Sequence, residues 1–174
     1  MKYFLLESDS FYSNAPSIIN WFGKIDKSNI CLGKSHLLPQ RMLFEIKNDK
    51  ELIFTDIVTH PFLLISDEFK KLVKLYQPRT PFKQVVLMDM ITHNLKLYHL
   101  PILKKIDCLL EESKTNLDRS EIKEAVLDYE KIKDYSLFQL DNVKGTHIVI
   151  RLDLLESALR RKMIGLCIRE VEQR

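Results

Sequence analysis

Apolar residues along the chain occur in short runs, separated by polar segments that contain proline or glycine. The first run, residues 3–6, predicts a buried strand. Residues 8–34 are polar and aromatic, with Pro16 and Gly23 among them, and they predict a loop that includes one helical turn. Alternation of polar and apolar positions at residues 42–46 predicts a second strand.

A strand followed by an amphipathic helix is the clearest pattern in the sequence. Residues 62–65 are all apolar and predict a buried strand, and Ser66 offers a hydroxyl that can cap a helix starting directly after it. The helix should bury one stripe with i, i+3, i+4 and i+7 spacing, which consists of Phe69, Leu72, Val73 and Tyr76. Pro78 then ends the helix.

Several further strands are predicted in the middle of the chain. Runs at residues 84–88, 95–100 and 105–109 follow one another closely, which is typical of an antiparallel meander. Residues 111–121 are the most polar part of the sequence and predict a surface loop. Two more short strands are expected, at residues 125–127 and 137–140.

The C-terminal part repeats the strand-helix pattern. A strand is predicted at residues 147–150 and a last one at 166–171, with Asp153 near the start of the helix between them. The apolar face of that helix is predicted to consist of Leu152, Leu155, Ala158 and Leu159. At a constant offset Phe69 matches Leu155, as expected for two related halves or for similar periodicity alone.

Together these elements predict an α+β fold in a single domain, residues 1–174, with mainly antiparallel sheets and two amphipathic helices in strand-helix units. The 27 Lys and Arg residues are interspersed with 24 Asp and Glu residues, which is typical of a solvated surface and not of a nucleic-acid-binding stripe. No apolar run has the length of a signal peptide core or a membrane span, so we expect a soluble, cytoplasmic protein.

Candidate chemistry is sparse. Three dispersed cysteines favour free thiols, and Cys108 and Cys167 fall in apolar runs where burial is expected. Cys31 and His36 lack the spacing of metal ligands, while His93 is expected at a turn and His99 in a strand. With only four glycines the chain has no phosphate-binding loop. We therefore predict no metal, no cofactor and no enzymatic activity.

Aromatic residues and acidic residues in the predicted loops are the candidates for binding a partner. Phe11, Tyr12, Trp21 and Phe22 lie in the first long loop, where they either anchor a partner or pin the loop to the core. The second loop carries Glu111 and Glu112. Tyr12, Trp21, Glu111 and Glu112 are accordingly the predicted partner-binding residues.

Several stretches resemble the imm-eleven family, immunity proteins of bacterial polymorphic-toxin systems. They are residues 2–6 (KYFLL), 19–21 (INW), 98–102 (YHLPI), 106–109 (IDCL), 148–150 (IVI), 164–166 (IGL) and 170–171 (EV). Arg151 departs from the family, whose members commonly have a serine or an acid after that strand, and this puts the helix cap in doubt. The resemblance implies a strand, helix, glycine turn and final strand at the C-terminus, and no catalytic residues.

The resemblance also implies a function, which is to bind and neutralise a cognate toxin protein inside the producing cell. The charge pattern and the short apolar runs predict that neither a nucleic acid nor a membrane is a partner. Two other classes stay open. A small hydrolase would need a Cys-His or Ser-His pair brought together by the fold. A nucleic-acid-binding module would need one face to carry the basic residues Lys70, Lys71, Lys74, Arg79, Lys83, Arg160, Arg161 and Lys162.

Overall fold

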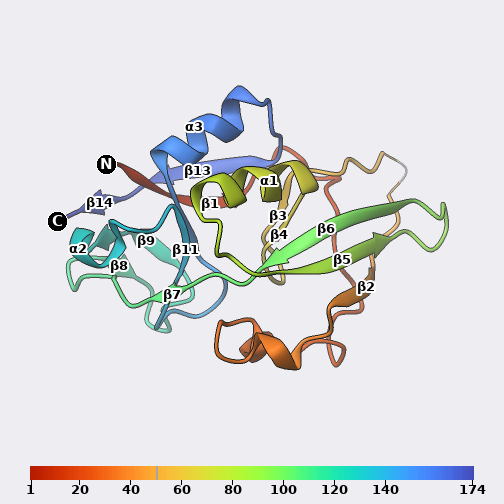
Figure 1. Cartoon of the computed structure of the whole chain (residues 1–174), viewed down its shortest axis with the longest axis horizontal. Helices are drawn as coiled ribbons and strands as arrows, with labels where there is room; N and C mark the ends of the chain where they lie inside the picture. Colours follow the sequence, from red (N-terminus) through yellow and green to blue (C-terminus); the bar gives the residue numbers. More distant parts are fainter. Residues whose placement is uncertain (50) are drawn as a thin grey trace.

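The computed structural model describes residues 1–49 and 51–174. Two five-stranded sheets make up most of the molecule (Figure 1). Helix α1 (Asp67–Tyr76) belongs to one sheet and α3 (Leu152–Arg160) to the other, and the two helices contact each other. The predicted α+β class with mainly antiparallel pairing is confirmed.

The first sheet has the order β2-β5-β6-β4-β3. Its strands are β2 (Arg41–Glu45), β3 (Ile57–Val58), β4 (Leu64–Ile65), β5 (Phe82–Met88) and β6 (Leu95–Pro101). Strands β5 and β6 form a long hairpin, and β2 joins β5 in parallel while the other pairs are antiparallel.

The second sheet has the order β13-β1-β12-β11-β7. Its strands are β1 (Tyr3–Ser8), β7 (Lys105–Ile106), β11 (Leu137–Leu140), β12 (Ile148–Arg151) and β13 (Leu166–Glu170). The smaller elements are the pair β8 (Lys114–Thr115) and β9 (Ile122–Glu124), the pair β10 (Val126–Leu127) and β14 (Glu172–Gln173), helix α2 (Tyr129–Ile132), and 3-10 turns at Lys27–Asn29 and Ser35–Leu37.

The two sheets share one local arrangement. Strands β4 and β5, joined by α1, are both antiparallel to β6, which lies between them. Strands β12 and β13, joined by α3, are likewise both antiparallel to the intervening β1. The two strand-helix units predicted from the sequence therefore have the same topology. They differ in the origin of the middle strand: β6 follows its unit directly, whereas β1 precedes its unit by most of the chain.

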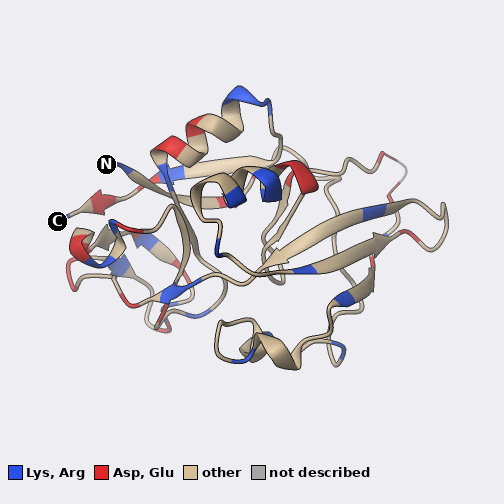
Figure 2. Ribbon diagram, in the orientation of Figure 1, with Lys and Arg blue, Asp and Glu red and all other residues tan. Residues whose placement is uncertain are grey.

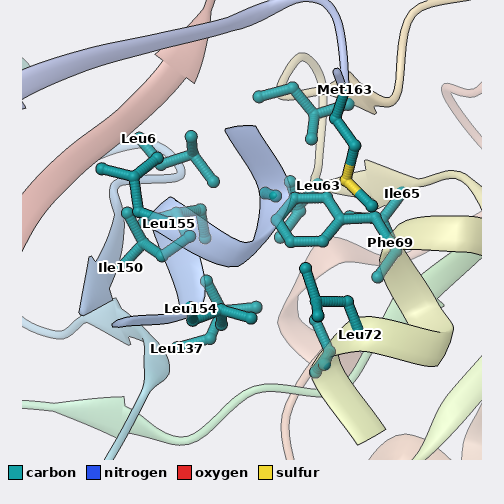
Figure 3. Packing of buried hydrophobic residues seen from close by; sticks show 14 of the residues in the cluster. Leu6, Leu63, Ile65, Phe69, Leu72, Leu137, Ile150, Leu154, Leu155 and Met163 are labelled. Atoms are coloured by element: carbon teal, nitrogen blue, oxygen red, sulfur yellow. The ribbon is translucent and has the colours of Figure 1, made fainter. Parts of the chain in front are cut away.

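A central hydrophobic cluster lies between the helices and both sheets (Figure 3). Phe69 and Leu72 reach it from α1, Leu154 and Leu155 from α3, and Ile150 from β12. The opposite faces of the sheets have their own clusters, one covered by the segment 18–38 and the other by the segment 106–135. Each sheet is therefore buried on both faces over much of its area.

Helix α1 begins as its sequence predicts. The Ser66 hydroxyl accepts a hydrogen bond of 3.2 Å from the amide of Phe69, and Phe69, Leu72 and Val73 are buried. At the other end of the helix, the Tyr76 hydroxyl is bonded to the Asp153 carbonyl of α3 at 3.1 Å. The first helix is thus capped at its start and bonded to α3 at its end.

The predicted buried face of the second long helix is partly wrong. Leu154, Leu155 and Ala158 are buried, whereas Leu159 is 50% exposed and Leu152 is only half-buried. At 100° per residue, the buried face is rotated by roughly 60° from the predicted one. The apolar positions of this helix cover too wide an arc for all of them to face the core, and the contact with α1 decides which do.

Two predictions for the middle of the chain are also wrong. The third meander strand is reduced to β7, which pairs in parallel with β11 in the other sheet. Ile102 contributes to the cluster of the first sheet and Leu103 to the central cluster, so the chain leaves the first sheet at this point. Residues 111–121 are not purely a loop, because Lys114–Thr115 pairs with Ile122–Glu124.

Candidate functional site

The first predicted partner-facing segment, residues 8–34, lies almost entirely in the segment 9–40 that connects β1 to β2. Segment 9–40 covers the outer face of the first sheet. It is anchored by buried apolar side chains, which are Ile18, Ile25, Ile30 and Leu38. Other apolar side chains of the same segment face solvent, namely Phe11, Ile19, Phe22, Leu32 and Leu37. Phe11 is 83% exposed and Phe22 88%, more than any other phenylalanine that the structure describes.

The four aromatic residues of this segment have two different environments. Trp21 is half-buried and packs against the cluster of the first sheet, with the Lys27 ammonium 5.0 Å from its ring centroid. Tyr12 is half-buried and makes an edge contact with Phe11, their centroids 5.5 Å apart. Trp21 thus pins the segment to the core, and a role of Tyr12 or Trp21 in partner binding stays a prediction.

Glu111 and Glu112, in the second predicted segment, are both exposed and precede the β8-β9 hairpin. Glu112 forms an ion pair of 3.4 Å with Arg174. Further along, Asp118 forms an ion pair of 3.0 Å with Lys144, whose amide is bonded to the Arg119 carbonyl. The hairpin is therefore held by the turn that connects β11 and β12.

A cleft of about 240 Å³ lies between this turn and the first segment. Lys27 and Ser28 line it from the 3-10 turn of segment 9–40, and Gly145 and Thr146 line it from the β11-β12 turn. Ile30 adds to the side formed by segment 9–40, and the other lining residues lie in strands of the two sheets or next to them. They are Phe62, Leu63, Leu100, Pro101, Leu103, Lys105, Gln139 and Ile148. The fold therefore places the first predicted segment on one side of this cleft and the β11-β12 turn on the other, while residues 111–121 do not line it.

His99 is the histidine with the most contacts to charged groups, and it is buried in the first sheet. Its Nε2 lies 3.0 Å from Oδ1 of Asp67, and its Nδ1 lies 3.3 Å from Nζ of Lys70. Burial, reinforced by the Lys70 charge, lowers the pKa of His99. In the neutral ring Nε2 donates to Asp67 and Nδ1 accepts from Lys70, so both nitrogens are used inside the fold.

The cysteines differ in their environment. Cys108 is buried, as predicted, and desolvation raises the pKa of its thiol to about 12. Cys167 is exposed on β13, so the prediction that it is buried is wrong; this short strand at the sheet edge turns it outward. Within residues 1–49 and 51–174 no three His, Cys, Asp or Glu side chains are grouped so that they could hold a metal ion.

The basic residues that a nucleic-acid-binding module would need on one face are dispersed, as Figure 2 shows for lysine and arginine generally. Lys71 is engaged by Asp67 and Glu68, at 3.0 and 2.6 Å. Lys70 lies over the Phe82 ring on the α1 side of the first sheet. Lys83 pairs in register with Leu100, a residue of the cluster on the opposite side, so it points away from α1.

Neither a family model nor a curated protein matches the chain. No helix among the described residues is long and apolar enough to cross a membrane. No local sequence pattern predicted the cleft, because Lys27, Lys105 and Gln139 are far apart in the chain. Strand pairing places Lys105 beside Gln139, and the 3-10 turn at Lys27–Asn29 supplies the other side.

Proposed function

We propose that this protein binds a protein partner stoichiometrically, and that it is an immunity protein which neutralises a cognate bacterial toxin in the cytoplasm of the producing cell. The observation that supports partner binding most directly is the exposure of Phe11 and Phe22 on a segment that is otherwise anchored. The resemblance of the sequence to the imm-eleven family supports the toxin as the partner.

Exposed phenylalanines are a suitable driving force for such binding. Burial of a phenylalanine side chain by a partner is worth roughly 1.5–3 kcal/mol. The segment pays little conformational entropy on binding, because Ile18, Ile25 and Ile30 already fix its path against the sheet. Aromatic side chains on a fixed surface are typical of the residues that dominate binding energy in protein interfaces.

The test uses substitutions at two neighbouring aromatic residues. The protein and its variants would be assayed for binding to the products of adjacent genes and for rescue of cells that express them. Phe22→Ala should weaken binding by at least tenfold and leave the melting temperature nearly unchanged, because Phe22 is 88% exposed. Trp21→Ala is the matched control for core packing and should lower the melting temperature.

Two results would contradict the proposal. One is a wild-type protein that neither binds nor protects against any adjacent product at micromolar concentration. The other is catalytic turnover of a substrate by the purified protein, which would favour the hydrolase class instead. A Phe22→Ala variant that binds as tightly as the wild type would move the interface away from this segment.

A further inference from the structure

We propose that the cleft between the two sheets is a binding site for a carboxylate carried on a short apolar chain. The site is separate from the exposed phenylalanines and does not depend on the identity of a toxin. The carboxylate has two possible sources, a free small acid or the C-terminus of a peptide, and both present the same group to the cleft.

One wall of the cleft is a single row of side chains across three strands. Lys105 on β7 pairs with Gln139 on β11, which pairs with Ile148 on β12. Residues paired in this way project from the same face of a sheet. Ile148 belongs to the central cluster, so Lys105 and Gln139 also project toward that face, between the two sheets.

The opposite wall supplies a second ammonium group. Lys27 Nζ donates a hydrogen bond of 3.4 Å to the Pro61 carbonyl and lies 5.0 Å from the centroid of the Trp21 ring. Because an ammonium group has three donors, the bond to Pro61 leaves others free for an anion. The bond to Pro61 keeps the ammonium group beside the residue that precedes Phe62, and both Lys27 and Phe62 line the cleft.

The charge of the cleft selects an anion. Its lining contains Lys27 and Lys105 and no aspartate or glutamate. Within residues 1–49 and 51–174 neither lysine forms an ion pair. Two like charges without a counter-ion in a concave site raise the local concentration of anions. The hydroxyl and amide groups of Ser28, Thr146 and Gln139 add neutral donors.

The remaining surface and the size of the cleft define the rest of the ligand. Phe62, Leu63, Leu100, Leu103 and Ile148 give the site an apolar part. The volume of about 240 Å³ lies below the range of about 300–1,000 Å³ that is usual for drug-sized ligands. A short aliphatic or small aromatic acid fits this combination, since it has one charged end and an apolar remainder.

The probe is hexanoate, added to the full-length protein and followed by heteronuclear NMR. We expect saturable shifts at Thr146, Gln139 and Leu103, and weaker binding as salt is raised. Hexanol has the same apolar chain without the charge and should bind at least tenfold more weakly. A peptide that ends in leucine with a free carboxylate distinguishes the two sources. Tighter binding of the peptide indicates a peptide C-terminus, and tighter binding of hexanoate indicates a free small acid.

Lys105→Gln and Lys104→Gln form a matched pair of variants. Both remove one positive charge from adjacent residues, but only Lys105 lines the cleft. Loss of a charge-assisted hydrogen bond should weaken hexanoate binding by on the order of tenfold in Lys105→Gln. Lys104→Gln should bind like the wild type. The proposal is wrong if hexanoate and the peptide cause no shifts at the cleft at millimolar concentration, if hexanol binds equally well, or if the two variants lose affinity equally.

Discussion

The buried face of α3 leads us to expect very different losses of stability when Leu155 and Leu159 are replaced with alanine. Leu155 is 1% exposed and Leu159, one turn later, is 50% exposed. Replacing Leu155 with alanine removes three buried carbon atoms, worth about 2.4 kcal/mol in transfer free energy at about 0.8 kcal/mol each. The cavity that remains adds to this, so the expected loss of unfolding free energy is about 3–4 kcal/mol.

Leu159→Ala is the internal control, because the helix propensities of the residues change in the same way at both positions. Half of the side chain is already in water and no enclosed cavity forms, so the expected loss is about 1 kcal/mol. Urea unfolding followed by circular dichroism gives both values, provided that the slope of free energy against urea concentration is unchanged. Equal losses for the two variants, or a larger loss for Leu159→Ala, would refute the assignment of the buried face.

Three further predictions concern the pH dependence, a glycine and the thiols. The pKa of His99 is lowered in the folded state, so unfolding takes up protons below about pH 6.5. The free energy of unfolding should therefore fall as the pH drops below this value, and His99→Gln should flatten this part of the plot of stability against pH. Gly165→Ala should destabilise the protein by more than about 1 kcal/mol in thermal or urea unfolding, since a Cβ would lie 2.5 Å from Thr55 Cβ and φ is +83°. A thiol reagent should modify Cys167 in the folded protein, as peptide mass spectrometry can show, and Cys108 only after unfolding.

Each of these has an outcome that contradicts it. A pH profile of His99→Gln parallel to the wild type below pH 6.5 would mean that His99 is not held neutral. Gly33→Ala is the control for the glycine, because nothing lies within 4 Å of a Cβ at Gly33, and equal effects of the two substitutions would contradict the close contact at Gly165. Equal labelling rates for Cys108 and Cys167 would contradict their different burial.

Local sequence signals predicted the first strand-helix unit well. The cap at Ser66 and the stripe that includes Phe69 and Val73 depend on residues within a few positions of one another, and the structure confirms them. The buried face of α3 could not be predicted in the same way. Leu154 and Leu159 are both apolar, and the choice between them depends on where α1 lies, which the local pattern does not contain.

The same limit applies to the sites. The polar character of residues 111–121 was correct, but the pairing of Lys114–Thr115 with Ile122–Glu124 has no strong periodic signal in such short strands. The sequence identified the aromatic group of the first loop without distinguishing Trp21, which packs on the core, from Phe22, which does not. The cleft depends on a row across three strands, and such a row is visible only once the register is known.

The position of β1 has a consequence for how the chain folds during synthesis. Residues 3–8 are made well before both neighbours of this strand, because β12 and β13 lie beyond residue 147. The first sheet needs only residues 41–101 and can pair while the ribosome is still making the rest. Closing so long a loop is slow compared with local pairing. Both edges of β1 are open until β12 and β13 have been made, so the nascent chain is expected to depend on protection of residues 3–8 during that time.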